Sequence, residues 1–228
     1  MKKIIILLLM FAGFITAQNF KVEKINGDVK ILKGTSEKWE TVKQGDVLSG
    51  EDVLLTERNA YILLNKDGKK FELKGDAAIG LNHIKQVSIN DLILALALDE
   101  IRNVPKIKKS TTARNTAVYG SKVTNKTKIS IDENVLGTKK INGAKILNEN
   151  GYSESSVIVA KEVFRNYPKV SMNFDDRLYF ADVLNKLELY QEAAAEYNKI
   201  KNLALSDKEK ETVASRIEDV NLKLIEKK

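Results

Sequence analysis

The sequence predicts an α+β protein with two domains, an N-terminal domain that is mostly β and a C-terminal domain that is α-helical. From residue 20 to residue 81, short apolar runs alternate with glycine-containing turns, a pattern typical of antiparallel strands. In the last third of the chain, the apolar residues recur at helical spacing instead. We therefore expect a β domain with one inserted helix over residues 19–147 and a helical domain over residues 152–228. The polar turn 148–155 would join them.

The first residues have the features of a secretory signal. Lys2 and Lys3 supply a positive start, Ile4–Phe14 is almost wholly apolar, and Ile15–Ala17 ends in a small residue suited to cleavage. The apolar run is shorter than the roughly 18 residues that span a bilayer. The sequence thus predicts that residues 1–17 are removed and that the mature protein is periplasmic or secreted. The alternative is an uncleaved signal, which would be its only contact with a membrane.

The composition excludes much of enzyme chemistry. The chain has no cysteine and a single histidine, His83. Thiol catalysis, iron–sulfur clusters and Cys-ligated zinc are excluded, and a histidine-based metal site or a Ser-His pair lacks partners. We therefore expect no catalytic residues, no cofactor and no metal, and we predict that the protein is not an enzyme.

The β region is divided by turns rich in glycine and acidic residues. Val29 and Ile31 should point inward, and Asp67-Gly68 should close a hairpin, because glycine tolerates the positive φ of a tight turn. A calcium loop with Gly68 at its sixth position would need an oxygen ligand at Leu63 and a carboxylate at Lys74. Neither residue provides one, so we interpret the acids of these turns as turn-forming residues.

The same region contains a sequence pattern that is found in a known family. A strand that follows a glycine comes first, a tryptophan comes next, and two longer motifs follow. The matching residues are Gly45, Leu48, Gly50, Asp52, Leu54 and Thr56, followed by Ala60, Ile62, Leu64, Asp67, Gly68 and Leu73. Over about residues 20–125 the chain resembles a FecR-type domain, which implies a small all-β extracytoplasmic module. Tyr119 and Ser121 stand where that family often has Arg and Thr. Only Met1–Lys3 precedes the apolar run, so the resemblance does not extend to the family's cytoplasmic signalling arm.

A helix is predicted between the strands and the basic stretch that follows. Asn90 is a candidate cap, Asp91 suits the N-terminal dipole, and Pro105 should end the helix. The apolar residues at helical spacing are Leu92, Ile93, Leu96, Ala97 and Ile101. We expect this wide apolar surface to pack on the sheet. The alternative is a groove for a partner.

The helical domain contains one strong spacing pattern. The residues predicted to form a helical-repeat core are Ala181, Leu184, Tyr190, Ala193, Tyr197 and Ile200. Their spacing resembles a tetratricopeptide repeat, in which small residues let two antiparallel helices approach closely. Glu188 replaces the usual turn glycine. Ser206 and Glu209 have capping-box spacing and predict a last helix, whose apolar stripe is Val213, Ile217, Val220 and Leu224.

The basic charge is concentrated in residues 102–145, which hold eleven basic and two acidic residues, a net charge of +9. The candidate anion-binding residues are Lys106, Lys108, Lys109, Lys122, Lys126 and Lys128. We expect an exported, non-catalytic binding or scaffold protein of the bacterial cell envelope that contacts unidentified envelope proteins. The alternative is a binder of anionic glycan or polymer that uses residues 102–145, and the charge is otherwise a solvated face. We expect no nucleic-acid partner, because the chain is predicted to be exported and no aromatic-studded basic motif accompanies its lysines.

Overall fold

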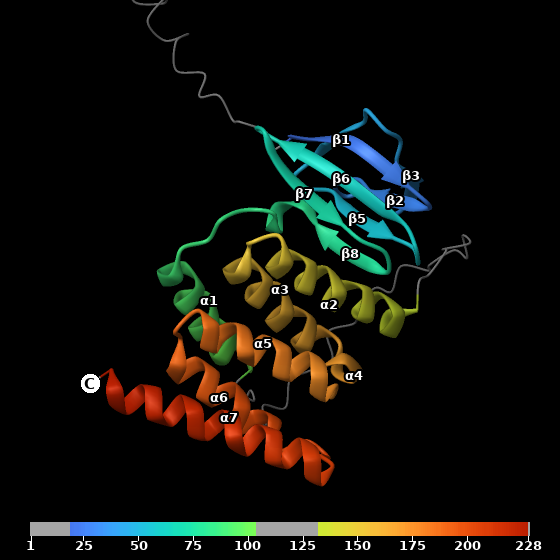
Figure 1. Cartoon of the computed structure of the whole chain (residues 1–228). Coiled ribbons are helices and arrows are strands. Elements are labelled where there is room, and N and C mark those ends of the chain that lie inside the picture. Colours follow the sequence, from blue (N-terminus) through green and yellow to red (C-terminus); the bar gives the residue numbers. More distant parts are fainter. Residues whose placement is uncertain (1–18, 104–131, 228) are drawn as a thin grey trace, which may run out of the picture. The chain divides into compact units, whose positions relative to one another are not determined.

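The structure is a computed structural model that describes residues 19–103 and 132–227. It divides into two compact units, Met1–Ile84 and Lys85–Lys228. The described part of the first unit contains two antiparallel sheets, and that of the second is helical (Figure 1). The predicted mixed α+β class is therefore confirmed.

The first unit has four strands in each sheet. One sheet has the order β4 (Val47–Ser49), β1 (Asn19–Asn26), β6 (Tyr61–Lys66) and β7 (Lys69–Leu73). The other has the order β3 (Trp39–Thr41), β2 (Val29–Leu32), β5 (Val53–Thr56) and β8 (Ala77–Gly80). Alternate residues are buried along β2 and β6, and Val29 and Ile31 are inside as predicted, whereas β5 and β8 each have three consecutive buried residues.

Three strand connections pass from one sheet to the other at one corner. Gly27 has a φ of +75°, and a Cβ placed there would lie 2.8 Å from the Cα of Ala60. A Cβ on Gly75 would lie 2.9 Å from the backbone nitrogen of Asn59. The buried Thr56 joins the corner, because its hydroxyl lies 2.6 Å from the carbonyl oxygen of Lys74. The glycines therefore allow close backbone approach.

The turn residues behave as the sequence predicts. Asp67 and Gly68 both have positive φ and join β6 to β7 in a two-residue hairpin. The carboxylate of Asp52 accepts hydrogen bonds from the backbone nitrogens of Gly34 and Ser49 at 3.1 and 2.8 Å. The acid holds two segments of backbone together, which accounts for its burial.

The second unit begins with α1 (Ile89–Asn103), which does not pack as predicted. Leu92 and Leu96 of α1 belong to the core cluster of the helical unit, so the expectation that this helix packs on the sheet is wrong. The predicted cap is also displaced, because Ser88 accepts the backbone hydrogen bond from Asp91. Pro105, the predicted stop, lies outside the described residues.

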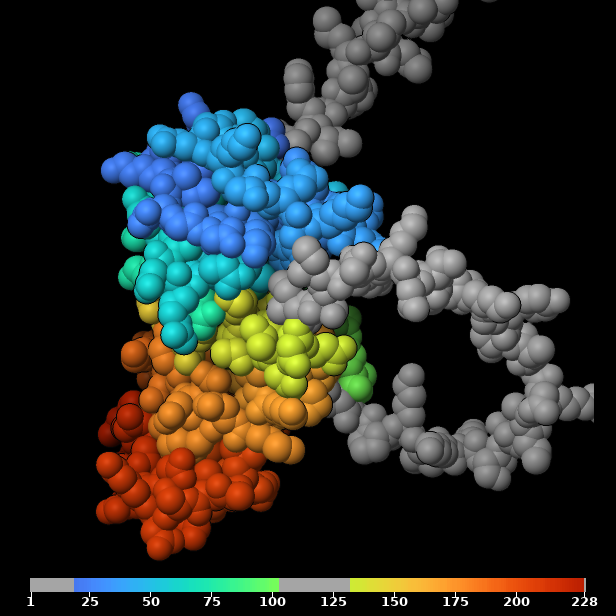
Figure 2. Space-filling model, turned by 90° about the vertical axis from the view of Figure 1, so that its right-hand side faces the viewer, coloured from blue at the N-terminus to red at the C-terminus, as the bar shows by residue number. Residues whose placement is uncertain are grey.

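The other helices follow one another as short hairpins. They are α2 (Glu133–Glu149), α3 (Ser153–Asn166), the short α4 (Pro168–Ser171), α5 (Phe174–Lys186), α6 (Tyr190–Ile200) and α7 (Asp207–Glu226). In the space-filling view the colours of this unit run in chain order from yellow through orange to red (Figure 2). Such an order is expected of helices that stack one after another.

The division between the units differs from the predicted one at residues 147–152. Residues 148–155 were expected to link two domains. They contain the end of α2, a tight turn and the start of α3, and the two helices pack against each other. The helix α2 lies in the range predicted as β domain. Its glycines, Gly137 and Gly143, weaken the helical pattern, since glycine costs about 1 kcal/mol relative to alanine in a helix.

Candidate functional site

The six lysines proposed for anion binding lie outside the described residues. The charge concentration in residues 102–145 is a property of the sequence. Of its basic residues, Lys145 is described and pairs with Asp176 of α5 at 2.5 Å. Lys139 is also described, and it is buried in α2. Both lysines lie in α2 and are therefore part of the helical unit.

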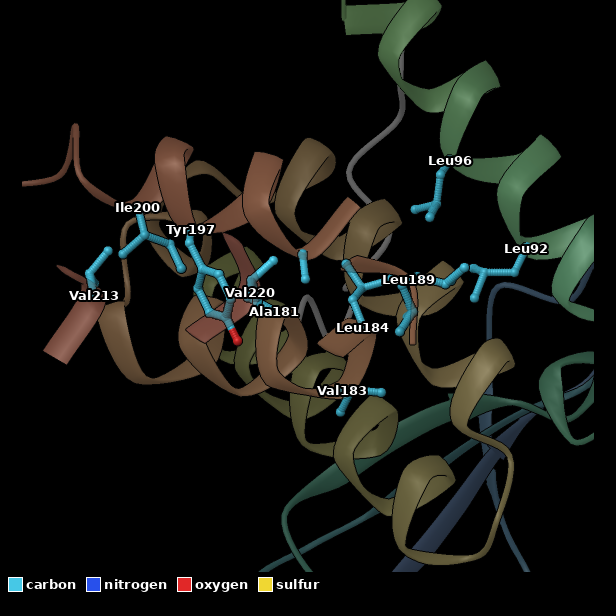
Figure 3. Close-up of a cluster of buried hydrophobic side chains, with 12 residues drawn as sticks. Leu92, Leu96, Ala181, Val183, Leu184, Leu189, Tyr197, Ile200, Val213 and Val220 are labelled. Atoms are coloured by element: carbon cyan, nitrogen blue, oxygen red, sulfur yellow. The ribbon is translucent and has the colours of Figure 1, made fainter. Parts of the chain in front are cut away.

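The six predicted repeat-core residues come together in the helical unit. Ala181, Leu184, Ala193, Tyr197 and Ile200 are buried in one cluster. Tyr190 is partly buried and packs against this cluster. Figure 3 shows Ala181 of α5 and Val220 of α7 close to Tyr197 of α6, Ile200 of α6 close to Val213 of α7, and Leu184 of α5 close to Leu189. The stripe predicted for the last helix faces the same core, and its Ser206–Glu209 capping box is formed.

Polar side chains join each helix to one further along the chain. Between α2 and α5, Lys145 bonds Asp176 and Asn148 bonds the Tyr179 hydroxyl, both 31 residues apart. Between α5 and α7, Arg216 bonds Asp182 and Asn185 bonds Asp219, both 34 residues apart. Between α3 and α6, Lys161 bonds Glu196, 35 residues apart. These five contacts span 31 to 35 residues, whereas the ion pairs of α1 and those between α5 and α6 join residues at other separations.

Glu196 of α6 is the centre of a partly buried ion cluster. Its carboxylate lies 2.7 Å from the Lys161 ammonium, 3.0 Å from that of Lys199 and 3.3 Å from the Arg177 guanidinium. The carboxylate is only 10% exposed. A buried charge of this kind is held by its partners, and removing one partner leaves an uncompensated charge.

The cluster continues onto α1. Lys161 lies 3.8 Å from the Asp99 carboxylate, which also pairs with Arg165. Glu100 pairs with Lys199. The acids of α1 therefore attach this helix to α3 and α6 beside the apolar contacts of Leu92 and Leu96.

The electrostatics of the cluster favour its charged form. Burial raises the pKa of Glu196, but Lys161, Lys199 and Arg177 outweigh it and hold that pKa below the usual value. Burial lowers the pKa of Lys199, but the carboxylates of Glu100 and Glu196 outweigh it and hold that pKa above the usual value. Both shifts favour the charged forms of Glu196 and Lys199, and the ion pairs of these two residues join α6 to α1, α3 and α5.

A groove lies beside the cluster, between α1 and α6. It has a volume of about 330 Å³. Its apolar lining comes from Ile93, Leu96 and Ala97 of α1, Leu184 of α5 and Ala195 of α6. The rest of the lining is polar or charged and includes Glu100, Lys161, Glu196 and Lys199 of the ion cluster.

Sequence analysis missed the ion cluster, although a signal for it exists. Glu196 follows the core residue Ala193 by three positions and precedes Ile200 by four, so helical spacing places it on the buried stripe of α6. An acid at such a position requires a buried cation. The sequence does not say which of its 38 basic residues provides it.

Asp132 caps α2 by accepting a hydrogen bond from the backbone nitrogen of Asn134 at 2.7 Å. Within residues 19–103 and 132–227, no group of acidic or histidine side chains could hold a metal ion. No helix in that part of the chain is both long and apolar enough to cross a membrane.

Comparisons with known protein families, with characterised proteins and with solved structures found no match to this chain.

Proposed function

We propose that this protein is an exported, non-catalytic scaffold of the bacterial cell envelope that binds other envelope proteins through its helical unit. The observation that carries the proposal is the recurrence of helix-to-helix hydrogen bonds at separations of 31, 34 and 35 residues. A tetratricopeptide repeat has about 34 residues. The bonds thus support two helical hairpins, α2–α3 and α5–α6, followed by α7 as a closing helix.

Such a stack supports binding because its helices form layers. The bonds connect α2, α5 and α7 to one another and α3 to α6, so alternate helices share a layer. Stacked repeats of this kind present an extended face that recognises other proteins. In this proposal the FecR-like β unit is a second extracytoplasmic module, carried on the same chain as the helical binding face.

Photo-crosslinking from single positions of the full mature chain tests the proposal. Val135 of α2 and Leu222 of α7 are exposed apolar residues on the layer of alternate helices, at 47% and 57% exposure. A photoreactive residue at either position should capture one and the same envelope protein in intact cells. Val47 of β4, at 66% exposure, is the matched control and should not capture it. Capture from Val47 alone would contradict a partner on the helical unit.

The alternative function is binding of an anionic glycan or polymer, favoured by the net charge of +9 in residues 102–145. Changing Lys106, Lys108, Lys109, Lys122, Lys126 and Lys128 to Gln should then abolish binding to the polymer and leave the protein crosslinks unchanged. Affinity for the polymer should fall steeply with salt, because charges are screened beyond about 8 Å at physiological ionic strength. Retention of all binding by the lysine variant would exclude this alternative.

A further inference from the structure

A recess of about 390 Å³ lies beside the ion cluster, and α1, α3, α4, α5 and α6 all contribute residues to its wall. Six residues of this wall are charged, namely the cations Lys161, Arg165, Arg177 and Lys199 and the acids Asp99 and Glu100. When Glu196 is added to these residues, four cations still face three acids. A concave surface with an excess of positive charge attracts anions.

Arg177 is not fully accounted for by the ion cluster. Its side chain is only 14% exposed, and its guanidinium has five N–H donors. Within the described residues these donors make one hydrogen bond, from Nη2 to the Glu196 carboxylate at 3.3 Å, which is long for a bond between opposite charges. Its Nε is buried without any partner, and no other side-chain nitrogen or oxygen in residues 19–103 and 132–227 is in that condition. Buried polar groups are normally paired, so the spare donors of Arg177 require an acceptor other than Glu196.

The Phe164 ring holds the Arg177 side chain in position. The guanidinium carbon lies 5.1 Å from the centroid of this ring, within the range of a cation–π contact. The ring is itself fixed by an edge-on contact with Phe180, whose centroid is 6.0 Å away. Arg165 follows Phe164 in α3 and pairs with Asp99 through Nη1. The wall therefore has two guanidinium groups that are anchored on one side and have donors in reserve.

We infer that this recess is a binding site for a small oxyanion, with Arg177 as its main binding residue and Arg165 as the second. A guanidinium presents paired N–H groups that match two oxygens on one atom, as in a carboxylate or a phosphate. The protein encloses Nε of Arg177, so the ligand bonds the Nη atoms at the end of the guanidinium. Lys161 and Lys199 contribute positive charge as single points.

The two acids of the wall lie on α1 and oppose the ligand. Asp99 is buried and is already paired with Arg165 and Lys161. Glu100 is 55% exposed and pairs with Lys199. The ligand therefore competes with Glu100 for Lys199, which keeps its second partner, Glu196, at 3.0 Å. This competition predicts that removing the charge of Glu100 strengthens binding.

Calorimetric titration of the full mature chain with inorganic phosphate and, separately, with succinate tests the inference, at an ionic strength held constant with sodium chloride. At least one of the two anions should bind saturably at one site per chain, and the comparison assigns the site to phosphate or to carboxylate. Arg177→Lys keeps the charge beside Glu196 but removes the fork, so it should weaken binding by about tenfold or more, because a hydrogen bond to a charged group is lost. Lys210→Gln, at an exposed position of α7, is the control and should bind as the wild type does.

Glu100→Gln provides a variant of opposite sign. It should strengthen binding by about threefold or more, since a like charge is removed from the wall. If Arg177→Lys fails to fold, Arg165→Lys takes its place, because that side chain is 28% exposed and should tolerate the change. Absence of saturable binding by both anions, unchanged affinity in the arginine variant, or weaker binding by Glu100→Gln would each overturn the inference. The site is independent of the proposed envelope partner, since neither Val135 nor Leu222 lines the recess.

Discussion

Single residues in this chain hold backbone positions that their type does not favour, and Glu188 is the clearest example. It lies in the turn between α5 and α6 with a φ of +60°. Asparagine and aspartate tolerate this left-handed region, and glycine occupies it freely, but a glutamate there is strained. Its carboxylate pairs with Lys227 at 2.9 Å, but both side chains are largely exposed, so the pair offsets little of the strain.

Replacing this glutamate should therefore stabilise the helical unit. We expect Glu188→Gly to raise the melting temperature by a few degrees, because the relief of strain exceeds the added freedom of the unfolded chain. Lys186→Gly, two residues earlier and within α5, is the matched control and should lower the melting temperature. Calorimetry of the two variants decides the matter, and an equal loss in both would show that the turn is not strained.

Glu196 makes the stability of the protein depend on pH. Its pKa in the folded protein is held below the usual value of a glutamate, because its cationic neighbours outweigh the effect of burial. Its contribution is therefore complete above that value and is lost as pH falls through the folded pKa. Glu196→Gln should destabilise the protein strongly at neutral pH, since it removes the carboxylate that pairs with Arg177 and lies nearest to Lys161, and the difference from the wild type should shrink in acid.

Urea unfolding at neutral pH and in acid measures this difference. Glu211→Gln, at an exposed position of α7, is the control and should change stability little at either pH. A penalty for Glu196→Gln that remains the same in acid would mean that the cluster gains nothing from the negative charge.

At the scale of single elements, those with local signals were predictable and those defined by distant partners were not. The Asp67–Gly68 hairpin and the Ser206 capping box depend on neighbours in sequence, and both are present. The partner of α1 was misjudged because an apolar stripe does not specify whether a sheet or another helix covers it. The six core residues of α5 and α6 followed from spacing. Of the cations around Glu196, Lys199 is three residues away on the same helix, whereas Lys161 of α3 and Arg177 of α5 have no local signature.

The helix α2 was not predicted from the sequence, in part because it contains Gly137. Gly137 lowers helix propensity, but a Cβ at this position would lie 2.8 Å from the Tyr167 ring. The absence of a side chain at Gly137 therefore allows the Tyr167 ring to pack closely against α2. We expect Gly137→Ala to destabilise the protein by about 1–3 kcal/mol through overpacking, although alanine is the better helix former.

Thr138→Ala, at the adjacent exposed position, is the control for this prediction and should have little effect on stability. Chemical denaturation of both variants compares them directly. A stabilising Gly137→Ala would mean that the Tyr167 ring moves aside without cost.

At the scale of the whole molecule, the boundary between the units determines which fragments fold. The sequence predicted fragments 19–147 and 152–228, whereas the compact units divide after Ile84. Fragment 152–228 lacks α1 and α2, the two helices that make the most contacts with α3. Buried residues of α3 such as Val157 and Val163 would face water in it.

We therefore expect fragment 85–228 to melt cooperatively with a helical circular dichroism spectrum and fragment 19–84 to retain a β spectrum. Fragment 152–228 should melt at a lower temperature and with a broader transition than fragment 85–228, because exposed core residues weaken its hydrophobic burial. Adding Leu92→Asp to fragment 85–228 should produce a similar loss, since this fully buried leucine joins α1 to the common core. If fragment 152–228 were as stable as fragment 85–228, α1 and α2 would be accessory to the helical unit, and the boundary predicted from the sequence would be the correct one.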